Sequence, residues 1–287
     1  MIKLFKTRLK KIYFLKRLVR FVKKHYHSDP KFISLLTTFE TYAPNSIGNP
    51  RVKSKLTKNT INGIFKSINL FYQNVLDAKV VALKIEDLKL KKDEKISVQK
   101  LEILLNKYGS DKANKHKYHI LYGKLLSNQE KISNILEIGL GTNNKDMVSN
   151  MGMEGKPGAS LRAFRDYLSE SRIIGLEYDK SVLFFEDRIE TYFYDQHSKK
   201  SINEISKKYN KQVDILIDDG LHSIVANINT IELAKNVLKP DGYLIIEDIG
   251  FDSLRLFNIA FELVANDFSL ELFTNNSCYA ACLKRVK

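Results

Sequence analysis

The stretch 213–222 reads VDILIDDGLH, and the stretch 243–248 reads YLIIED. Each is a short apolar run that ends in two carboxylates. Continuous apolar runs of this length are typical of strands that are buried on both faces, as in a parallel sheet. Ligands of open parallel sheets bind beyond the carboxyl ends of the strands, which is where these acidic pairs stand. The two stretches therefore predict an α/β protein whose chemistry lies at the carboxyl ends of its strands.

The same texture of short β-rich runs and helical stretches extends from about residue 96 to the end of the chain. The predicted strands are Asn134–Ile138, Arg172–Glu177, Ile189–Tyr194, Val213–Asp218, Tyr243–Asp248, Leu270–Phe273 and Cys278–Leu283. Most successive strands are separated by enough chain for a crossover, but the turn 274–277 is too short for one, so the last two strands form an antiparallel hairpin. We therefore expect a doubly wound, mostly parallel, seven-stranded Rossmann-like sheet.

The positive charge is concentrated near the start of the chain. Lys and Arg number 47 against 33 Asp and Glu, a net charge of +14, and ten of the basic residues lie between Lys3 and Lys24. Apolar residues recur there every three or four positions, so residues 2–26 are predicted to form a basic amphipathic helix. We expect its apolar stripe to pack on the chain or on a second subunit of a homo-oligomer. Peripheral contact with an anionic membrane is the second alternative.

A charged connector marks the predicted domain boundary. Residues 91–95 read KKDEK and follow further helical patterns at 61–76 and 80–90. We therefore divide the chain into a basic, mainly helical N-terminal region, residues 1–95, and a catalytic domain, residues 96–287. No nucleic-acid-binding module is recognisable in the basic region, so a nucleic-acid partner is not expected.

The composition excludes several classes of protein. Of the 287 residues 44% are hydrophobic and 10% aromatic, which suffices for a packed core and excludes wholesale disorder. No stretch approaches the roughly 20 consecutive apolar residues of a membrane span. The two cysteines, Cys278 and Cys282, neither make a disulfide framework nor have metal-finger spacing. We expect a cytoplasmic protein, with the inner face of the membrane as its one alternative location.

Residues at the ends of the first three predicted strands suit an adenosine-containing cofactor. The first strand runs into Gly139 and Gly141, which let the backbone turn tightly and approach a ligand. The second ends at Glu177, an acidic residue placed to accept hydrogen bonds from ribose hydroxyls. The third is followed by Asp195 and Gln196, which could hydrogen-bond an adenine edge. Each of these residues alone could be an ordinary turn or cap residue, but together they favour the cofactor.

Four carboxylates end the two strands quoted at the start. They are Asp218, Asp219, Glu247 and Asp248. Clustered carboxylates repel one another and are costly to desolvate, and a bound cation would relieve that cost. Ligands that are all oxygen favour Mg²⁺ or another hard divalent ion. His222, three residues after Asp219, could then take the proton of a hydroxyl held on that cation. The alternative is that Asp218 caps a helix and His222 is an ordinary surface residue.

In the order and spacing of its motifs the chain resembles the class I S-adenosylmethionine-dependent methyltransferases. More narrowly, it resembles the metal-dependent sugar O-methyltransferases of the mycinamicin and macrocin type. The motifs that carry the resemblance are Tyr108–Lys112 with His116 and Tyr118, Leu136–Gly141, Gly158–Arg162 with Arg165–Tyr167, Asp195–Gln196, Ile217–His222, Leu238–Gly242 and Ile246–Asp248. They span about residues 104–249, and the first hundred residues lie outside the resemblance.

The resemblance implies a role for each matching residue. The implied metal ligands are Asp219, Glu247 and Asp248, and the implied catalytic residues are His222, as general base, and Asp219. The implied contacts of the S-adenosylmethionine cofactor are Lys112, Tyr118, Glu137, Gly139, Gly141, Ser160, Glu177, Asp195, Gln196 and Asp218. The implied reaction is methyl transfer to a sugar hydroxyl.

The acceptor that we favour is a nucleotide-activated or surface-polysaccharide sugar, such as a heptose or a deoxysugar. Two alternatives keep the methyltransferase chemistry: a catechol-like O-methyltransferase and a phospho-amine N-methyltransferase, of which only the first needs the metal. A third is a non-catalytic nucleotide- or glycan-binding subunit on the same fold. A DNA amino-methyltransferase is disfavoured, because the fourth strand ends in Asp-Asp-Gly in place of a Pro-Pro-aromatic turn.

Overall fold

A computed structural model describes residues 81–250, 253–254, 261–275 and 277–286, together with residues 63, 67 and 70. The predicted basic helix at 2–26 lies outside the described residues. The chain divides into two compact units, Met1–Asp77 and Ala78–Lys287. The sequence places a boundary at residue 95, whereas the second unit already includes residues 78–95.

The residues just before the predicted boundary differ from the expected helix and connector. Leu83–Lys84 forms a short strand and Ile85–Asp87 a single 3₁₀ turn. The expected connector opens a helix instead, because the Glu94 carboxylate accepts a hydrogen bond from the Lys91 amide at 2.7 Å and so caps the first turn. Ile85 is fully buried, which explains why this segment belongs to the second unit.

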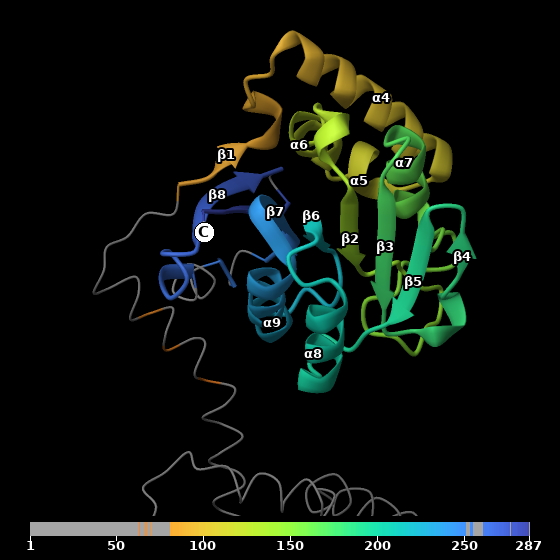
Figure 1. The fold of residues 1–287 in the computed structure, drawn as a ribbon, viewed down its shortest axis with the longest axis vertical. Coiled ribbons are helices and arrows are strands. Elements are labelled where there is room, and N and C mark those ends of the chain that lie inside the picture. The colour runs from red at the N-terminus through yellow and green to blue at the C-terminus, as the bar shows by residue number, and fades with distance from the viewer. Residues whose placement is uncertain are drawn as a thin grey trace, which may run out of the picture. The chain divides into compact units, whose positions relative to one another are not determined.

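The sheet is mixed and mostly parallel, with nine strands among the described residues (Figure 1). In spatial order they are β1 (Leu83–Lys84), β8 (Phe268–Thr274), β9 (Tyr279–Arg285), β7 (Leu238–Ile249), β6 (Val213–Asp218), β2 (Asn134–Ile138), β3 (Arg172–Glu177), β5 (Ile189–Phe193) and β4 (Phe185–Glu186). Strands β7, β6, β2, β3 and β5 run parallel, and β9 runs antiparallel to both β7 and β8. The Rossmann-like sheet and its terminal hairpin are as predicted, but the two-residue strands β1 and β4 raise the count from seven.

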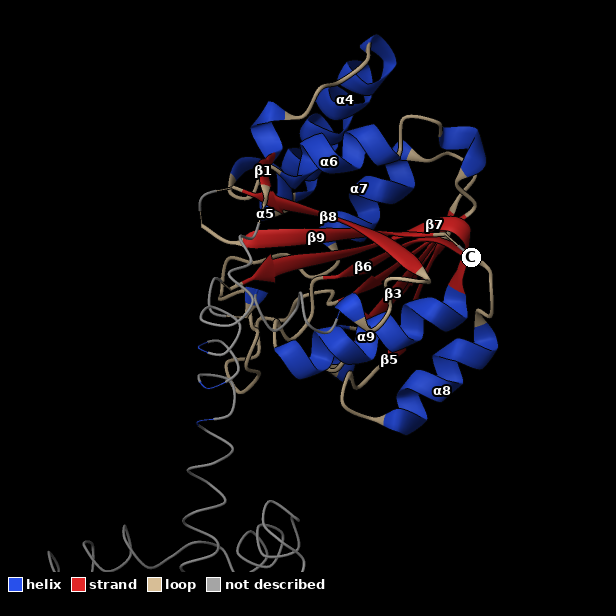
Figure 2. Cartoon of the chain, turned by 90° about the vertical axis from the view of Figure 1, so that its left-hand side faces the viewer, coloured by secondary structure: helices blue, strands red, loops and turns tan. Residues whose placement is uncertain are grey.

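Helices cover both faces of the sheet (Figure 2). One face carries α4 (Lys92–Tyr108), α6 (Tyr118–Leu125) and α7 (Ala159–Tyr167), with the short α5 (Asp111–Asn114) beside them, and the other carries α8 (Lys199–Lys208) and α9 (Ile224–Val237). Single 3₁₀ turns lie at Gln129–Lys131 and Lys180–Val182. Two apolar clusters fill the layers between sheet and helices. No described helix has the length and apolar character needed to cross a bilayer.

The register of the central strands sets the position of the site. Ile138 at the end of β2 pairs with Asp218 at the end of β6, and Asp218 pairs with Ile246 of β7. The residues that follow these three strands therefore emerge side by side. Glycines after β2, carboxylates after β6 and carboxylates at the end of β7 share one edge of the sheet.

We predict that Leu216→Ala destabilises the chain by about 2–5 kcal/mol, because Leu216 lies fully buried in the central strand β6 and the truncation leaves a cavity. Chemical denaturation monitored by circular dichroism measures the change. The matched control is Ile103→Ala, which truncates a side chain that is 67% exposed on α4 and should alter stability by no more than about 0.5 kcal/mol. Equal effects of the two substitutions would contradict this assignment of the core.

Candidate functional site

A buried lysine lies among the carboxylates at the ends of three strands. Lys112 Nζ is 2.5 Å from Asp219 Oδ2, 2.6 Å from Glu247 Oε2 and 3.3 Å from Glu137 Oε1. The lysine comes from α5, whose N-cap Ser110 accepts a hydrogen bond from the Lys112 amide at 3.4 Å. Only 2% of Lys112 is exposed. The sequence analysis predicts a cluster of carboxylates that a bound cation would neutralise. It does not predict that the Lys112 ammonium supplies part of the neutralising positive charge.

Burial and charge set the protonation of this cluster. Burial lowers the pKa of Lys112, but the surrounding Asp219, Glu247 and Glu137 outweigh it and raise that pKa well above the usual value. Burial also raises the pKa of Glu247 and of Glu137, and the opposing effect of Lys112 does not fully compensate. The ammonium is therefore held charged, and the carboxylates depend on it.

Both oxygens of Glu247 are already engaged within the protein. Lys112 donates to one oxygen, and the hydroxyl of Tyr122 donates to the other. Tyr122 was not predicted, although it follows Tyr118 by one helical turn on α6, and that spacing places both hydroxyls on one helix face. Tyr118 donates to Asp248 Oδ1 at 2.7 Å. The two tyrosines thus orient the two carboxylates that end β7.

The structure brings Asp219, His222 and Asp248 together as a group that could hold a cation. Each offers one ligand atom, and these atoms lie within 4.8 Å of one another. The predicted ligand set contains Glu247 in place of His222, but Glu247 is turned toward Lys112, whose ammonium occupies the space between Glu247 and Asp219. The carboxylates of Asp219 and Asp248 are 26% and 27% exposed. Partly hydrated oxygen ligands of this kind fit a hard divalent ion such as Mg²⁺.

Two members of this group adopt unusual backbone conformations. His222 and Asp248 both have φ of 53°, the left-handed region that non-glycine residues rarely enter. Such conformations persist only where the surrounding structure imposes them, and they concentrate at functional sites. His222 Nε2 lies 3.6 Å from Asp219 Oδ1, and its side chain is 30% exposed. The imidazole therefore faces both the carboxylate and solvent, as a base for an incoming ligand must.

A cavity of about 400 Å³ opens beside this group. Its lining includes six of the residues predicted for the site: Gly139, Gly141, Glu177, Asp195, Gln196 and Asp219. It also includes residues that the sequence did not suggest, among them Thr142, Tyr178 and Asp146–Ser149. Tyr178 directly follows Glu177, the last residue of β3. Its position just after a strand could have indicated from the sequence that it lines the cavity.

Backbone amides fix the Glu177 carboxylate at the cavity wall. Its Oε2 accepts from the Leu140 amide at 2.9 Å, and its Oε1 accepts from the amides of Tyr178 at 2.8 Å and Asp179 at 3.0 Å. An acceptor held in this way is ready for the hydroxyls of a ribose. The role of Glu177 as a cofactor contact stays a prediction.

Gln196 lines the cavity, but its side-chain amide is engaged within the protein. Gln196 Oε1 accepts from the Leu221 amide at 2.8 Å, and Nε2 donates to Asp218 Oδ1 at 2.9 Å. Asp218 is fully buried and also accepts from Asn227 Nδ2 at 3.1 Å. Gln196 and Asp218, both predicted as cofactor contacts, thus bind together the segments after β5 and β6.

Glu137 and Ser160, also predicted as cofactor contacts, bond to each other behind the cavity. Ser160 Oγ donates to Glu137 Oε2 at 2.8 Å, and Glu137 is fully buried. Lys112 and Tyr118 do not line the cavity either, and they contact the strand-end carboxylates instead. In the structure these four residues contact the strand-end carboxylates or one another and do not line the cavity.

The loop after β2 must be glycine at its first position. Gly139 has φ of +93°, and a Cβ there would lie 2.1 Å from the Asp219 carbonyl oxygen. The loops after β2 and β6 therefore approach more closely than any side chain would permit. This contact fixes Asp219 against the floor of the cavity.

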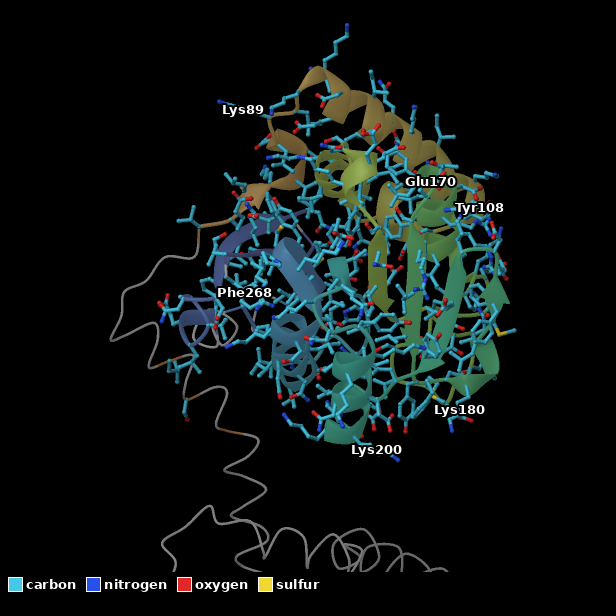
Figure 3. All side chains as sticks on the ribbon, in the orientation of Figure 1. Lys89, Tyr108, Glu170, Lys180, Lys200 and Phe268 are labelled. Atoms are coloured by element: carbon cyan, nitrogen blue, oxygen red, sulfur yellow. The ribbon has the colours of Figure 1, made fainter. Side chains whose placement is uncertain are left out.

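Two of the remaining sequence motifs contact each other away from the cavity. Tyr108, labelled in Figure 3, donates its hydroxyl to Asp166 Oδ2 at 2.5 Å and so joins the end of α4 to α7. Arg165 Nη2 donates to the Tyr108 hydroxyl at 3.3 Å. This contact holds the helix that precedes the Lys112 loop.

Comparison with known proteins identifies the fold. In solved structures the chain is similar to MycE, a methyltransferase from the mycinamycin biosynthetic pathway. The complex of MycE with Mg, SAH and mycinamycin VI has 22% sequence identity and a TM-score of 0.54 over 66% of this chain and 55% of that one. A second MycE crystal, with Mg and SAH, gives 23% identity and a TM-score of 0.53 over the same shares. The fold is therefore the Rossmann-like methyltransferase fold that the sequence predicts.

One curated relative is similar in sequence. It is the 8-demethyl-8-α-L-rhamnosyl tetracenomycin-C 2′-O-methyltransferase of Streptomyces olivaceus, 24% identical over 157 residues, which are 54% of this chain and 39% of that protein. No family model matches the chain. The chain spans 39% of the length of this relative and about half the length of MycE.

We predict that Lys112→Met destabilises the chain by about 3–5 kcal/mol, because it leaves buried carboxylates without their cation. The loss should shrink as the pH falls. Glu137 and Glu247 have raised pKa values in the folded chain, so the folded state binds more protons and gains stability relative to the unfolded state below those values. Urea denaturation at neutral and mildly acidic pH measures both effects.

The control is Lys107→Met, which removes an exposed lysine paired with Asp166 at 3.3 Å. An exposed pair of this kind contributes little, so stability should hardly change at either pH. A Lys112→Met chain as stable as this control, or one whose deficit grows on acidification, would contradict the described charge balance.

Proposed function

We propose that the protein transfers a methyl group from S-adenosylmethionine to a sugar hydroxyl, with a divalent cation bound at the strand ends. The observation that carries the proposal is the group Asp219, His222 and Asp248, of which Asp219 also lines the 400 Å³ cavity. Asp219 thus belongs both to the proposed cofactor cavity and to the candidate cation site. The relatives support this reading, since MycE was solved with Mg, SAH and mycinamycin VI, and the Streptomyces protein is named as a 2′-O-methyltransferase of a rhamnosyl compound.

The cavity has the size and lining for the cofactor. Its volume lies within the range of roughly 300–1,000 Å³ that is usual for small-molecule sites. The Glu177 carboxylate, oriented by three backbone amides, serves the ribose hydroxyls. Asp195, whose Oδ1 accepts from the His197 amide at 2.9 Å, serves the adenine. Gly139 and Gly141 keep the loop after β2 close to the ligand.

Three carboxylates and one imidazole have separate roles in the proposed methyl transfer. When bound, the cofactor supplies the methyl group, and a divalent cation makes the acceptor hydroxyl more acidic. Asp219 and Asp248 would hold that ion, and Glu247 accepts a hydrogen bond from Lys112 and so keeps the ammonium beside them. His222 would stay off the ion and accept the hydroxyl proton at Nε2, the nitrogen that faces Asp219. Fixing both reactants at neighbouring positions supplies about 7–11 kcal/mol of the rate enhancement.

The acceptor that we propose is a nucleotide-activated or surface-polysaccharide sugar, such as a heptose or a deoxysugar. A vicinal diol suits two neighbouring carboxylates that hold one ion, because both of its oxygens can reach the ion. The net charge of +14 would draw a diphosphate-linked sugar toward the protein.

The full-length protein, incubated with labelled S-adenosylmethionine, Mg²⁺ and a panel of acceptors, is expected to methylate a sugar. The panel holds nucleotide sugars, free heptoses and deoxysugars, a catechol and phosphoethanolamine, and mass spectrometry identifies the product. A chelator should abolish turnover, and added Mg²⁺ should restore it. Methylation of phosphoethanolamine alone, undiminished by chelator, would refute the metal-assisted mechanism. Binding of the cofactor without any product would favour a non-catalytic subunit.

His222→Ala should lower kcat by roughly 10²–10⁴-fold, the usual contribution of a general base. The Kd for S-adenosylmethionine, measured by isothermal titration calorimetry, should stay within about twofold of the parent value, because His222 does not line the cavity. Glu177→Ala is the matched variant, in which we expect the reverse, a weakened cofactor Kd. Full turnover in His222→Ala would exclude His222 as the base.

A further inference from the structure

A second cluster of metal-binding side chains shares Asp248 with the first group, and its other two members are not used by the proposed reaction. It consists of His116 from the loop before α6, Asp248 at the end of β7 and Cys278 from the turn before β9. One ligand atom from each lies within 4.8 Å of the others. Asp248 Oδ1 is 3.2 Å from His116 Nδ1 and 3.1 Å from Cys278 Sγ. Three segments far apart in sequence thus place a nitrogen, an oxygen and a sulfur around one point.

The histidine of this cluster presents a buried nitrogen without a hydrogen-bond partner. His116 is 7% exposed, and Nδ1 makes no hydrogen bond among the described residues, although Asp248 Oδ1 is near. The other nitrogen, Nε2, faces Asp111 Oδ2 at 3.5 Å. Metal-bound imidazoles have this arrangement, with one nitrogen aimed at the ion and the other at a carboxylate that fixes the ring. The polar atom nearest to Nδ1 is the Asp248 oxygen at 3.2 Å, and an ion at this point would be ligated by both atoms.

The surrounding residues hold the three ligands in place. The rings of His116 and Tyr118 stack with their centroids 5.3 Å apart and their planes 12° apart. Asn275 joins the other two segments, because Nδ2 donates to the His116 carbonyl at 3.1 Å and Oδ1 accepts from the Cys278 amide at 3.2 Å. The ligand atoms are therefore positioned by packing and hydrogen bonds before any ion binds.

We propose that His116, Asp248 and Cys278 form a second cation site, separate in its chemistry from the oxygen-rich group, that binds Zn²⁺. A sulfur, a nitrogen and an oxygen are the donors that Zn²⁺ takes, whereas Mg²⁺ takes oxygen. Zinc bonds of roughly 2.0–2.3 Å in a tetrahedron place ligands roughly 3.3–3.8 Å apart, close to the observed 3.1 and 3.2 Å.

Cobalt binding by the full-length, metal-free chain in excess Mg²⁺ tests the proposal. Co²⁺ adopts the geometry of Zn²⁺ and reports on its ligands by absorption. We expect one equivalent to bind with a thiolate-to-cobalt charge-transfer band, and Zn²⁺ to displace it. Cys278→Ser should abolish the band and weaken Zn²⁺ binding at least tenfold. Cys282→Ser, the control at the only other cysteine, should retain both.

Further variants separate this site from the proposed methyl transfer. Asp111→Asn should weaken Zn²⁺ binding by about tenfold, the usual effect of losing the carboxylate behind a ligating histidine. Asp219→Asn alters the oxygen-rich group and the ion pair with Lys112 but none of the three proposed zinc ligands, so the cobalt band should persist even if turnover is lost. Circular dichroism verifies that each variant is folded. The proposal is overturned if the parent chain shows no thiolate band, or if folded Cys278→Ser binds Zn²⁺ as tightly as the parent.

Discussion

The ion pairs of Lys112 are the constraint on which the site depends. Asp219, Glu247 and Glu137 lie at the ends of three different strands, and without a buried ammonium their charges would repel one another in a largely buried region. The ammonium thus ties the short helix α5 to the carboxyl edge of the sheet. It also engages one oxygen of Glu247, so Asp219 and Asp248 are the carboxylates that we propose for a ligand.

The loops that follow β2, β5 and β6 contact one another as well as the sheet. Gly139 lets the loop after β2 touch the backbone of Asp219, and Gln196 connects the loop after β5 to Asp218 and Leu221. His222 and Asp248 are held at positive φ within this framework. Strain of this kind is tolerated because the neighbouring contacts leave the backbone no alternative. The result is a rigid wall with a few partly exposed polar atoms.

Asp248 belongs to two donor groups of different chemistry. On one side stand Asp219 and His222, and on the other His116 and Cys278. Burial raises the pKa of Asp248, but hydrogen bonds from Tyr118 and Cys278 and the charge of His116 outweigh it and lower the pKa below its usual value. Asp248 is therefore an ionised oxygen donor in the absence of any bound cation.

The sequence alone determined the fold class, and it indicated the strand ends at which the candidate site lies. The bounds of β2, β3 and β6 agree with the predicted strands, because a buried parallel strand must be apolar throughout and must end where a turn residue allows it. Strands β1 and β4 were missed, since two residues carry no periodicity. Only the tertiary structure decided that Lys112 neutralises the carboxylates and that His116 meets Cys278, 162 residues away by numbering. Local patterns report which face of a segment is buried, whereas the identity of its distant neighbours is set by the packing of the whole chain.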